Sequence, residues 1–344
     1  MVEETVTTER SAPEAPAQQA VDLTLLVCTY NRAADVRDML AAASAQDTDG
    51  TCTFEVLVVD NNSSDDTRAV VEHAIAAGQK NVRYLFEPRQ GKSHALNAGL
   101  TAARGEYFTT ADDDYIFPPG TVRTIVSCFR DRSELSFVGG KVLPLWRGTT
   151  PRWLTPAMWS PIAVADYGDT EYYVDASKPI CLLGCSFRRA DVLAVGGYRT
   201  GLSVSKNRVG GVEDLEVLQR LWKSGRRGLY LPDLVFHHKV AASRVTKQYY
   251  RRWHTGHGRF YAALRDPDFE RSSGRLFDLP WHAYRQAGAA ALSWAAAMAR
   301  GRTDDAFEAE TRLRFFAGFW QGRREEARSG GRTPQFDDGS GHLT

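Results

Sequence analysis

The sequence predicts an α/β fold in which helices flank a mostly parallel central sheet. Short apolar runs alternate with segments of helical length over residues 21–130, which is typical of right-handed β-α-β units. A polar segment follows each of the first four apolar runs. Because the ligands of open parallel sheets bind beyond the carboxyl ends of the strands, these polar segments are expected to meet in one binding site.

Four strands and three helices are predicted in this region, in strict alternation. The predicted strands are 23–28 (LTLLVC), 54–60 (FEVLVVD), 82–87 (VRYLFE) and 106–111 (EYFTTA). The predicted helices are 35–46 (DVRDMLAAASAQ), 67–77 (TRAVVEHAIAA) and 93–104 (SHALNAGLTAAR). The segment NNSSDD precedes the second helix and is rich in side chains that cap helix N-termini.

The alternation breaks down after Phe129. Residues 144–161 contain three Trp and four Pro, which predicts an irregular segment. Further along the chain we expect a strand, a short helix and a glycine turn in 181–198, an amphipathic helix in 213–225, and helices around 281–300 and 304–328.

Composition predicts two disordered ends, a leader at 1–20 and a tail at 329–344. The longest apolar stretch, 286–299, is shorter than the roughly 20 residues that a bilayer span requires, so we expect no membrane span. The leader lacks the apolar core of a signal peptide. We therefore predict a cytoplasmic protein, with peripheral contact at the inner face of the cell membrane as an open option.

The charge balance argues against a nucleic-acid partner, because Lys and Arg number 43 and Asp and Glu number 42. The five cysteines lack the spacing of a metal site and are expected to be reduced thiols. No G-x-G-x-x-G, P-loop or G-x-S-x-G motif is present. These absences argue against a dinucleotide site, a P-loop and an α/β-hydrolase elbow.

Three consecutive carboxylates, Asp112, Asp113 and Asp114, follow the fourth predicted strand. Carboxylate oxygens are preferred ligands of Mg²⁺ and Mn²⁺, which are often shared with substrate phosphates. Such a metal neutralises a diphosphate leaving group. The alternative is a helix N-cap before Pro118 and Pro119, although that role needs one Asp and not three.

Five motifs occur in order along the chain: LLVCTYNRAADV, FEVLVVDNNSSDDT, GKSHALNAGL, TTADDDYIFPPG and GGVEDLEVLQRLWKSG. Together they resemble the inverting family 2 glycosyltransferases of the GT-A fold, over roughly residues 21–240. The resemblance implies a nucleotide-sugar-binding half at 21–130 and an acceptor-binding half at 131–240. A helical extension is predicted at 241–328, and its pattern SRVTKQYYRRWHTGHGRF resembles the extension of some bacterial members that build surface polysaccharides or glycoconjugates.

The resemblance also implies a binding loop for the nucleotide base. Its predicted residues are Thr29, Tyr30, Asn31 and Arg32, with Asp60 accepting a hydrogen bond from uracil or thymine. Tyr30 offers a π-face for stacking, and its alternative role is to plug the core at a strand end. For Asp60 the alternative is a turn or helix cap within NNSSDDT.

The donor's phosphates and the metal are assigned in the same way. Arg89 and Lys92 follow the third strand and are candidates for the base edge or the phosphates, or for solvated surface positions. By the resemblance, Asp112 and Asp113 reach ribose and phosphate and Asp114 is the expected metal ligand. His237 and His238 are further candidate ligands, because neutral imidazole suits Mn²⁺; the alternative is a hydrogen-bonded histidine at a strand end.

Glu213 and Asp214 form a second acidic pair. An inverting transfer needs a carboxylate that takes the proton of the acceptor hydroxyl, and Asp214 matches the family's base. In the first turn of a helix the dipole is expected to keep it ionised. The alternative is that both acids only stabilise the helix N-terminus.

Together these observations predict a Mn²⁺- or Mg²⁺-dependent enzyme. It is expected to move one sugar from a nucleoside-diphosphate donor, UDP- or dTDP-linked, to a carbohydrate, lipid-linked or other hydroxyl acceptor. Processive polysaccharide synthases of this superfamily carry the motif Q-x-x-R-W, whereas this chain has QYYRRW at 248–253, which is one residue longer. We therefore expect transfer of a single sugar and not processive synthesis. A metal-dependent nucleotidyltransferase or phosphohydrolase and a non-catalytic binding module remain the alternatives.

Two further groups of residues have alternative roles. Trp146, Trp153 and Trp159 are candidates for sugar stacking or for packing. The Arg- and Trp-rich C-terminal helices either contact a membrane surface or pack on the catalytic domain.

Overall fold

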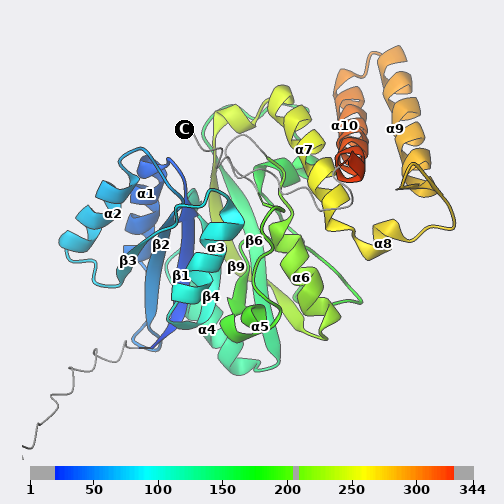
Figure 1. Cartoon of the computed structure of the whole chain (residues 1–344). Coiled ribbons are helices and arrows are strands. Elements are labelled where there is room, and N and C mark those ends of the chain that lie inside the picture. Colours follow the sequence, from blue (N-terminus) through cyan, green and yellow to red (C-terminus); the bar gives the residue numbers. More distant parts are fainter. Residues whose placement is uncertain (1–19, 204–208, 329–344) are drawn as a thin grey trace, which may run out of the picture.

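The computed structural model describes residues 20–203 and 209–328. The predicted leader, apart from its last residue, and the predicted tail lie outside these residues. The described part consists of a large sheet covered by helices on both faces, followed by a helical extension (Figure 1). This arrangement confirms the α/β class expected from the alternating pattern.

The main sheet has nine strands, which are arranged in the order β3-β2-β1-β4-β8-β6-β9-β5 with β7 paired to β9. The strands are β1 (Val21–Thr29), β2 (Phe54–Asp60), β3 (Val82–Phe86), β4 (Gly105–Asp112), β5 (Tyr115–Ile116), β6 (Leu135–Trp146), β7 (Tyr172–Val174), β8 (Ser186–Arg188) and β9 (Arg227–Val240). The first four form one parallel group, and β6 and β9 form a second parallel pair. The short strand β8 joins the two groups through antiparallel pairings.

Helices cover the sheet because its strands bury side chains on both faces. The helices of this part are α1 (Ala33–Ser44), α2 (Thr67–Ala76), α3 (Lys92–Ala102), α4 (Thr121–Asp131), α5 (Arg189–Ala194) and α6 (Glu213–Lys223). Leu25 of β1 packs in one core with α1, α2 and α4, whereas Leu26 packs in the other core with α3, α5 and α6. The side chains of successive strand residues therefore pack into the cores on opposite faces of the sheet.

Strand β6 corrects the sequence prediction, because it continues to Trp146 into the segment expected to be irregular. Gly139, Gly140 and Pro144 interrupt the β pattern within it. Gly140 is needed where β9 approaches, since a Cβ there would lie 1.8 Å from the carbonyl oxygen of Leu234. The pairing of β6 with β9 continues to Trp146 and Val240. Its hydrogen bonds keep the strand extended although the glycines and the proline disfavour a strand locally.

The extension begins with a short 3₁₀ helix, η3 (Ala242–Arg244), directly after β9. Its helices are α7 (Lys247–Leu264), α8 (Pro267–Glu270), α9 (Trp281–Ala299) and α10 (Thr303–Arg328), with a small hairpin of β10 (Arg275–Leu276) and β11 (Leu279–Pro280) before α9. Helix α10 packs between α7 and α9 (Figure 1). Gly318 permits close packing, because a Cβ there would lie 1.9 Å from the carbonyl oxygen of Thr255.

Within the described ranges, none of the helices has the length and apolar character that crossing a bilayer requires.

Candidate active site

A cleft of about 1330 Å³ lies beyond the carboxyl ends of β1 and β4. Its other walls come from residues 156–168, from the start of α6 and from α7. Ten of the residues predicted from the sequence line this cleft: Thr29, Tyr30, Arg32, Lys92, Asp112, Asp113, Asp114, Trp159, Glu213 and Asp214. The polar segments that follow separate strands therefore meet at one edge of the sheet, as parallel topology requires.

Asp112 ends β4 and keeps a partly exposed carboxylate in the cleft. The ammonium group of Lys92, at the first position of α3, lies 2.9 Å from Oδ1 of Asp112. Lys92 thus supplies the counter-charge for the first member of the acidic triple.

Asp113 is largely buried in the floor of the cleft and has two different partners. The hydroxyl of Thr29 donates a hydrogen bond of 2.7 Å to Oδ2, and Nε of Arg32 lies 3.8 Å from Oδ1. Burial raises the pKa of Asp113 to about 7, although the charge of Arg32 acts in the opposite direction. Thr29 is itself buried, so it acts on the site through Asp113.

Asp114 is held by three basic side chains from different parts of the chain. Its carboxylate lies 3.2 Å from Nη1 of Arg32 and 3.5 Å from Nη1 of Arg244, and Nε2 of His238 lies 3.1 Å from its Oδ1. Burial works against ionisation, but the contact with His238 and the two guanidinium groups hold the pKa of Asp114 well below its usual range. Asp114 is therefore a carboxylate at neutral pH.

The residues fit a divalent cation only if the cation is shared with a substrate. Within residues 20–203 and 209–328 no cluster of three or more His, Cys, Asp or Glu side chains could hold a metal by itself. All three carboxylates of the triple line the cleft, however, and Oδ1 of Asp114 is buried without a well-aligned hydrogen bond from any described residue. Mg²⁺ and Mn²⁺ commonly take one or two protein carboxylates and complete their shell with phosphate oxygens and water.

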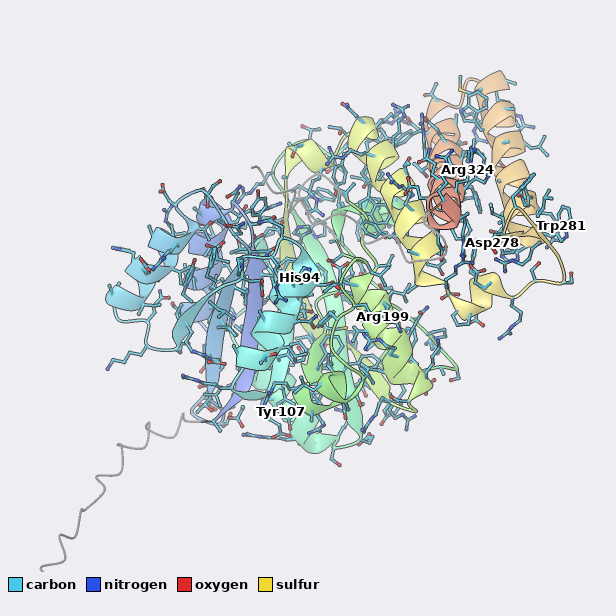
Figure 2. All side chains as sticks on the ribbon, in the orientation of Figure 1. His94, Tyr107, Arg199, Asp278, Trp281 and Arg324 are labelled. Atoms are coloured by element: carbon cyan, nitrogen blue, oxygen red, sulfur yellow. The ribbon has the colours of Figure 1, made fainter. Side chains whose placement is uncertain are left out.

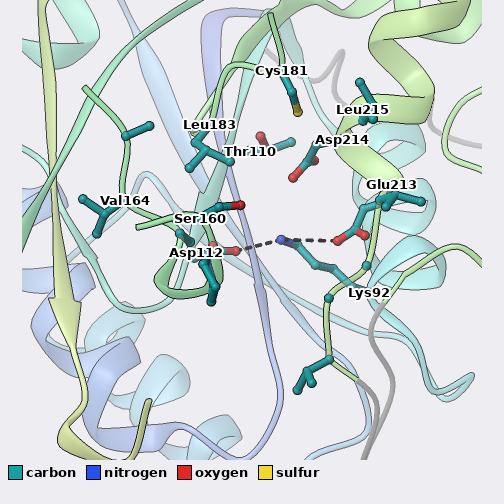
Figure 3. Close-up of a pocket in the computed structure, with 18 of the residues that line it drawn as sticks. Lys92, Thr110, Asp112, Ser160, Val164, Cys181, Leu183, Glu213, Asp214 and Leu215 are labelled. Carbon is teal, nitrogen blue, oxygen red and sulfur yellow. Dashed lines mark hydrogen bonds and ion pairs between the residues drawn. The ribbon is translucent and has the colours of Figure 1, made fainter. Parts of the chain in front are cut away.

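The second acidic pair faces the triple across the cleft (Figure 3). Glu213 is the first residue of α6, and its Oε1 lies 3.7 Å from Nζ of Lys92. Burial raises the pKa of Glu213 to about 7 against the charge of Lys92, and its Oε2 has no hydrogen-bond partner among the described residues. Burial also raises the pKa of Asp214, again opposed by Lys92. For Asp214 this direction is opposite to the helix-dipole effect expected from the sequence.

Two of the predicted residues on the strand ends do not line the cleft. The carboxylate of Asp60 accepts hydrogen bonds of 2.8 Å from the backbone N–H of Ser63 and from the hydroxyl of Tyr84, so it organises the turn after β2. Arg89 donates to both carboxylate oxygens of Glu87 at 2.8 Å. The roles in donor binding that we expect for Asp60 and Arg89 stay predictions.

Asn31 and the two histidines also lie outside the cleft lining. Asn31 joins the loops after β1 and β2, since its Oδ1 accepts a 2.7 Å hydrogen bond from the backbone N–H of Ser64. His237 and His238 are consecutive in β9, and their side chains therefore point to opposite faces of the sheet. His238 is fully buried against Asp114, so it reaches the cleft only through that carboxylate.

The extension contributes cleft residues that the sequence analysis did not identify. Arg244 lies in η3, and Tyr249, Trp253 and His257 line the cleft from α7. The rings of Trp253 and His257 stack with centroids 4.5 Å apart. The basic, aromatic pattern of 243–260 was the available signal, but it does not indicate which face turns toward the cleft.

The three tryptophans of the Pro-rich segment have different surroundings. Trp159 lines the cleft. Trp153 packs edge-on against Tyr250, with ring centroids 4.8 Å apart, and Trp146 is partly exposed at the end of β6. The alternative of packing is therefore confirmed for Trp153.

Comparison with known proteins identifies the family. Residues 24–193 match the family described as glycosyl transferase family 2. The glucosyl-dolichyl phosphate glucuronosyltransferase of Haloferax volcanii is 23% identical over 230 residues, which cover 65% of this chain and 71% of that protein. The succinoglycan biosynthesis protein ExoM of Rhizobium meliloti is 25% identical over 243 residues, which cover 69% of this chain and 74% of that protein.

Solved structures confirm the fold. The mannosyltransferase PcManGT from Pyrobaculum calidifontis, solved in complex with GDP-Man and Mn²⁺, matches with a TM-score of 0.57 and 23% identity. The match covers 92% of this chain and 90% of that one. With this architecture, the family match and the transferase relatives, the chain belongs to glycosyltransferase family 2 and is an enzyme of the GT-A fold.

Proposed function

We propose that this glycosyltransferase moves a single sugar from a UDP- or dTDP-linked donor to an acceptor hydroxyl, with inversion at the anomeric carbon. The observation that carries the proposal is the pair of opposed acidic groups in one cleft, with Lys92 between Asp112 and Glu213 (Figure 3). One group suits a nucleoside diphosphate with its cation, and the other suits a proton acceptor. A displacement reaction needs both a site for the leaving diphosphate and a proton acceptor, and the proposed residues for these two roles lie on opposite walls of the cleft.

The donor's diphosphate is expected to lie against the basic side chains of the cleft, Arg32, Lys92 and Arg244. Asp112 and Asp114 are the residues that would hold Mn²⁺ or Mg²⁺. When bound, the cation would neutralise charge on the diphosphate leaving group. PcManGT was solved with Mn²⁺, which supports the proposal of a divalent cation. Tyr30 also lines the cleft with its ring partly exposed, available for stacking on the base.

Asp214 is the proposed general base. The acceptor oxygen forms a bond to the anomeric carbon, the bond from that carbon to the diphosphate oxygen breaks, and the leaving diphosphate takes the electron pair. The acceptor's hydroxyl proton passes to the carboxylate of Asp214. Attack from the face opposite the leaving group inverts the anomeric centre. The raised pKa of Asp214 makes it a better proton acceptor once it is ionised.

The acceptor is proposed to be a carbohydrate or a lipid-linked saccharide in polysaccharide or glycoconjugate synthesis. One relative is named a succinoglycan biosynthesis protein and another a glucosyl-dolichyl phosphate glucuronosyltransferase, which supports this class. All five cysteines are free, which suits a reducing cytoplasm. We therefore propose a cytoplasmic enzyme that reaches its acceptor from the inner face of the membrane.

The test begins with melting temperature in the presence of UDP, dTDP, GDP, ADP or CMP, each with and without Mn²⁺. A ligand at about 100 times its Kd stabilises the folded state by about 2.7 kcal/mol, and we expect UDP or dTDP to do so when Mn²⁺ is present. The matching sugar nucleotides are then incubated with saccharide acceptors, and the nucleotide product and the product's anomeric configuration are determined by NMR.

The nucleotide product separates the competing activities. Transfer releases a nucleoside diphosphate and gives a product of inverted configuration. Release of a nucleoside monophosphate would instead indicate a nucleotidyltransferase or phosphohydrolase. Donor binding without any product, in wild type and Asp214→Asn alike, would indicate a binding module.

A further inference from the structure

Helix α9 is covered along only one narrow stripe. Its buried residues are Ala283, Ala290 and Ala297, which are seven positions apart and lie on one side of the helix. This stripe faces α10, and Figure 1 shows α9 on the side of α10 away from α7. Most of the remaining circumference of α9 is exposed.

The exposed surface of α9 is apolar. Leu292 has 75% of its surface exposed and Met298 has 50%. The rings of Trp281 and Trp294 are also exposed, and Figure 2 shows Trp281 at the outer edge of the molecule. Phe277, in the turn before the helix, is 77% exposed. A helix that is apolar around most of its circumference is normally buried in a core or in lipid.

The uncharged stretch of this helix lies between two arginines. Residues 271–302 contain five arginines and a single acidic residue, Asp278, and three of these arginines form ion pairs with neighbouring carboxylates: Arg271 with Asp268, Arg275 with Glu270 and Arg302 with Asp305. No charged residue occurs between Arg285 and Arg300. Both of these arginines are exposed, and in the described part of the chain neither forms a side-chain ion pair. They lie at the two ends of the uncharged stretch.

We propose that α9 and the turn before it bind the headgroup layer of an anionic lipid bilayer, with the helix lying in the plane of the surface. None of the described helices is both long and apolar enough to span a bilayer, but the aromatic and apolar exposed surface of α9 suits a helix that lies at the bilayer interface. Arg285 and Arg300 complement anionic headgroups, and Trp side chains favour the interface. We name the exposed residues Phe277, Trp281, Leu292, Trp294 and Met298 the α9 surface.

Lipid fits the α9 surface better than a second protein does. A partner helix covers one seam of residues, whereas the exposed apolar residues of α9 extend around most of the helix. Fluid acyl chains and headgroups can surround such a surface on all its free sides. Helix α9 lies toward the same end of the molecule as the carboxyl ends of β1 and β4 (Figure 1), so binding would bring the cleft toward the bilayer. The proposal does not depend on the identity of the donor or acceptor.

The test is co-sedimentation of the full chain with vesicles of phosphatidylcholine alone and of phosphatidylcholine mixed with phosphatidylglycerol. We expect binding to the anionic vesicles, weakened by added salt. The double variant Arg285→Gln, Arg300→Gln should bind roughly fivefold more weakly for each arginine removed, the factor that corresponds to about 1 kcal/mol per charge. Arg37→Gln, an exposed arginine of α1, serves as the control and should bind like wild type.

A second pair of variants tests the contribution of apolar side chains to vesicle binding. Leu292→Gln should weaken vesicle binding by about tenfold or more, whereas Leu193→Gln should leave it unchanged. Leu193 is also an exposed helical leucine, 44% exposed, but lies in α5. Melting temperatures of both variants should equal that of wild type, because neither side chain is buried.

Three outcomes would overturn the proposal. The first is absence of binding to anionic vesicles at low salt, and the second is binding that Leu292→Gln and Leu193→Gln reduce equally. The third is a lipid-free dimer, measured by light scattering, that Leu292→Gln dissociates while vesicle binding stays unchanged. In that case the α9 surface is an interface between copies of this chain.

Discussion

Lys92 and Asp112 form an ion pair in the floor of the cleft, with the ammonium nitrogen 2.9 Å from Oδ1 of the carboxylate. The same nitrogen lies 3.7 Å from Oε1 of Glu213. One cation thus connects the acidic triple with the acidic pair that contains the proposed base. Burial opposes its charge, but the surrounding carboxylates hold the pKa of Lys92 well above its ordinary value.

Replacing Lys92 is therefore expected to change the pH dependence of the reaction. The charge of Lys92 lowers the pKa of Asp214, which burial raises. In Lys92→Met that opposing charge is lost, so the pKa of Asp214 rises further. Because the base must be ionised to accept a proton, the acid limb of the kcat/KM profile should move to higher pH.

The profile of Lys92→Arg is the control, since it keeps a positive charge and should retain an acid limb close to that of wild type. An acid limb that stays in place in Lys92→Met, or that moves to lower pH, would show that Lys92 does not act on the base.

Asp214→Asn should remove the proton acceptor and leave the donor-binding wall of the cleft intact. We expect kcat to fall by about 10²–10⁴-fold, while the Kd for the donor, measured by calorimetry, stays essentially that of wild type. The control is Asp233→Asn, an exposed position on β9, which should have wild-type kinetics. Equal loss of donor affinity and kcat in Asp214→Asn would place Asp214 in donor binding and not in proton transfer.

The two adjacent histidines provide a matched pair for the metal proposal. His238 contacts Asp114, and His237 faces the other side of β9. If Asp114 binds the cation, His238→Asn should raise the Mn²⁺ concentration needed for half-maximal activity by about 10–100-fold. His237→Asn should leave that concentration unchanged.

A purely structural role of His238 would lower the melting temperature of His238→Asn without altering its Mn²⁺ requirement. Equal effects of the two substitutions on the Mn²⁺ requirement would contradict the assignment of Asp114 as a ligand.

The helical extension can be tested at two glycines. Gly318→Ala should destabilise the protein by about 1–3 kcal/mol, because the added methyl group would lie 1.9 Å from the carbonyl oxygen of Thr255 in α7. Gly288→Ala in α9 meets no atom within 4 Å and should stabilise by up to about 1 kcal/mol through helix propensity. Urea denaturation measures both changes, and a neutral Gly318→Ala would mean that α7 and α10 do not pack this closely.

The predictable parts of the fold are those in which local pattern and final structure agree. The four parallel strands β1 to β4 and helices α1 to α3 alternate with strong periodicity, and the structure has them within a few residues of their predicted bounds. Strand β6, Leu135–Trp146, was not predicted from the sequence, because two glycines and a proline interrupt its pattern. Its pairing with β9, far along the chain, supplies the hydrogen bonds that the local sequence does not indicate.

The candidate active site also has features that the sequence predicts and features that only the tertiary structure shows. The sequence by itself determined which strand ends carry polar side chains, and parallel topology then brings Asp112 and Lys92 into one cleft. Only the tertiary structure decided which cation accompanies which carboxylate. Arg244 and His238 reach Asp114 because β9 returns beside the acidic triple and η3 follows it directly. Charge pairing depends on distances of a few ångströms between segments remote in sequence, and those distances exist only once the whole chain has packed.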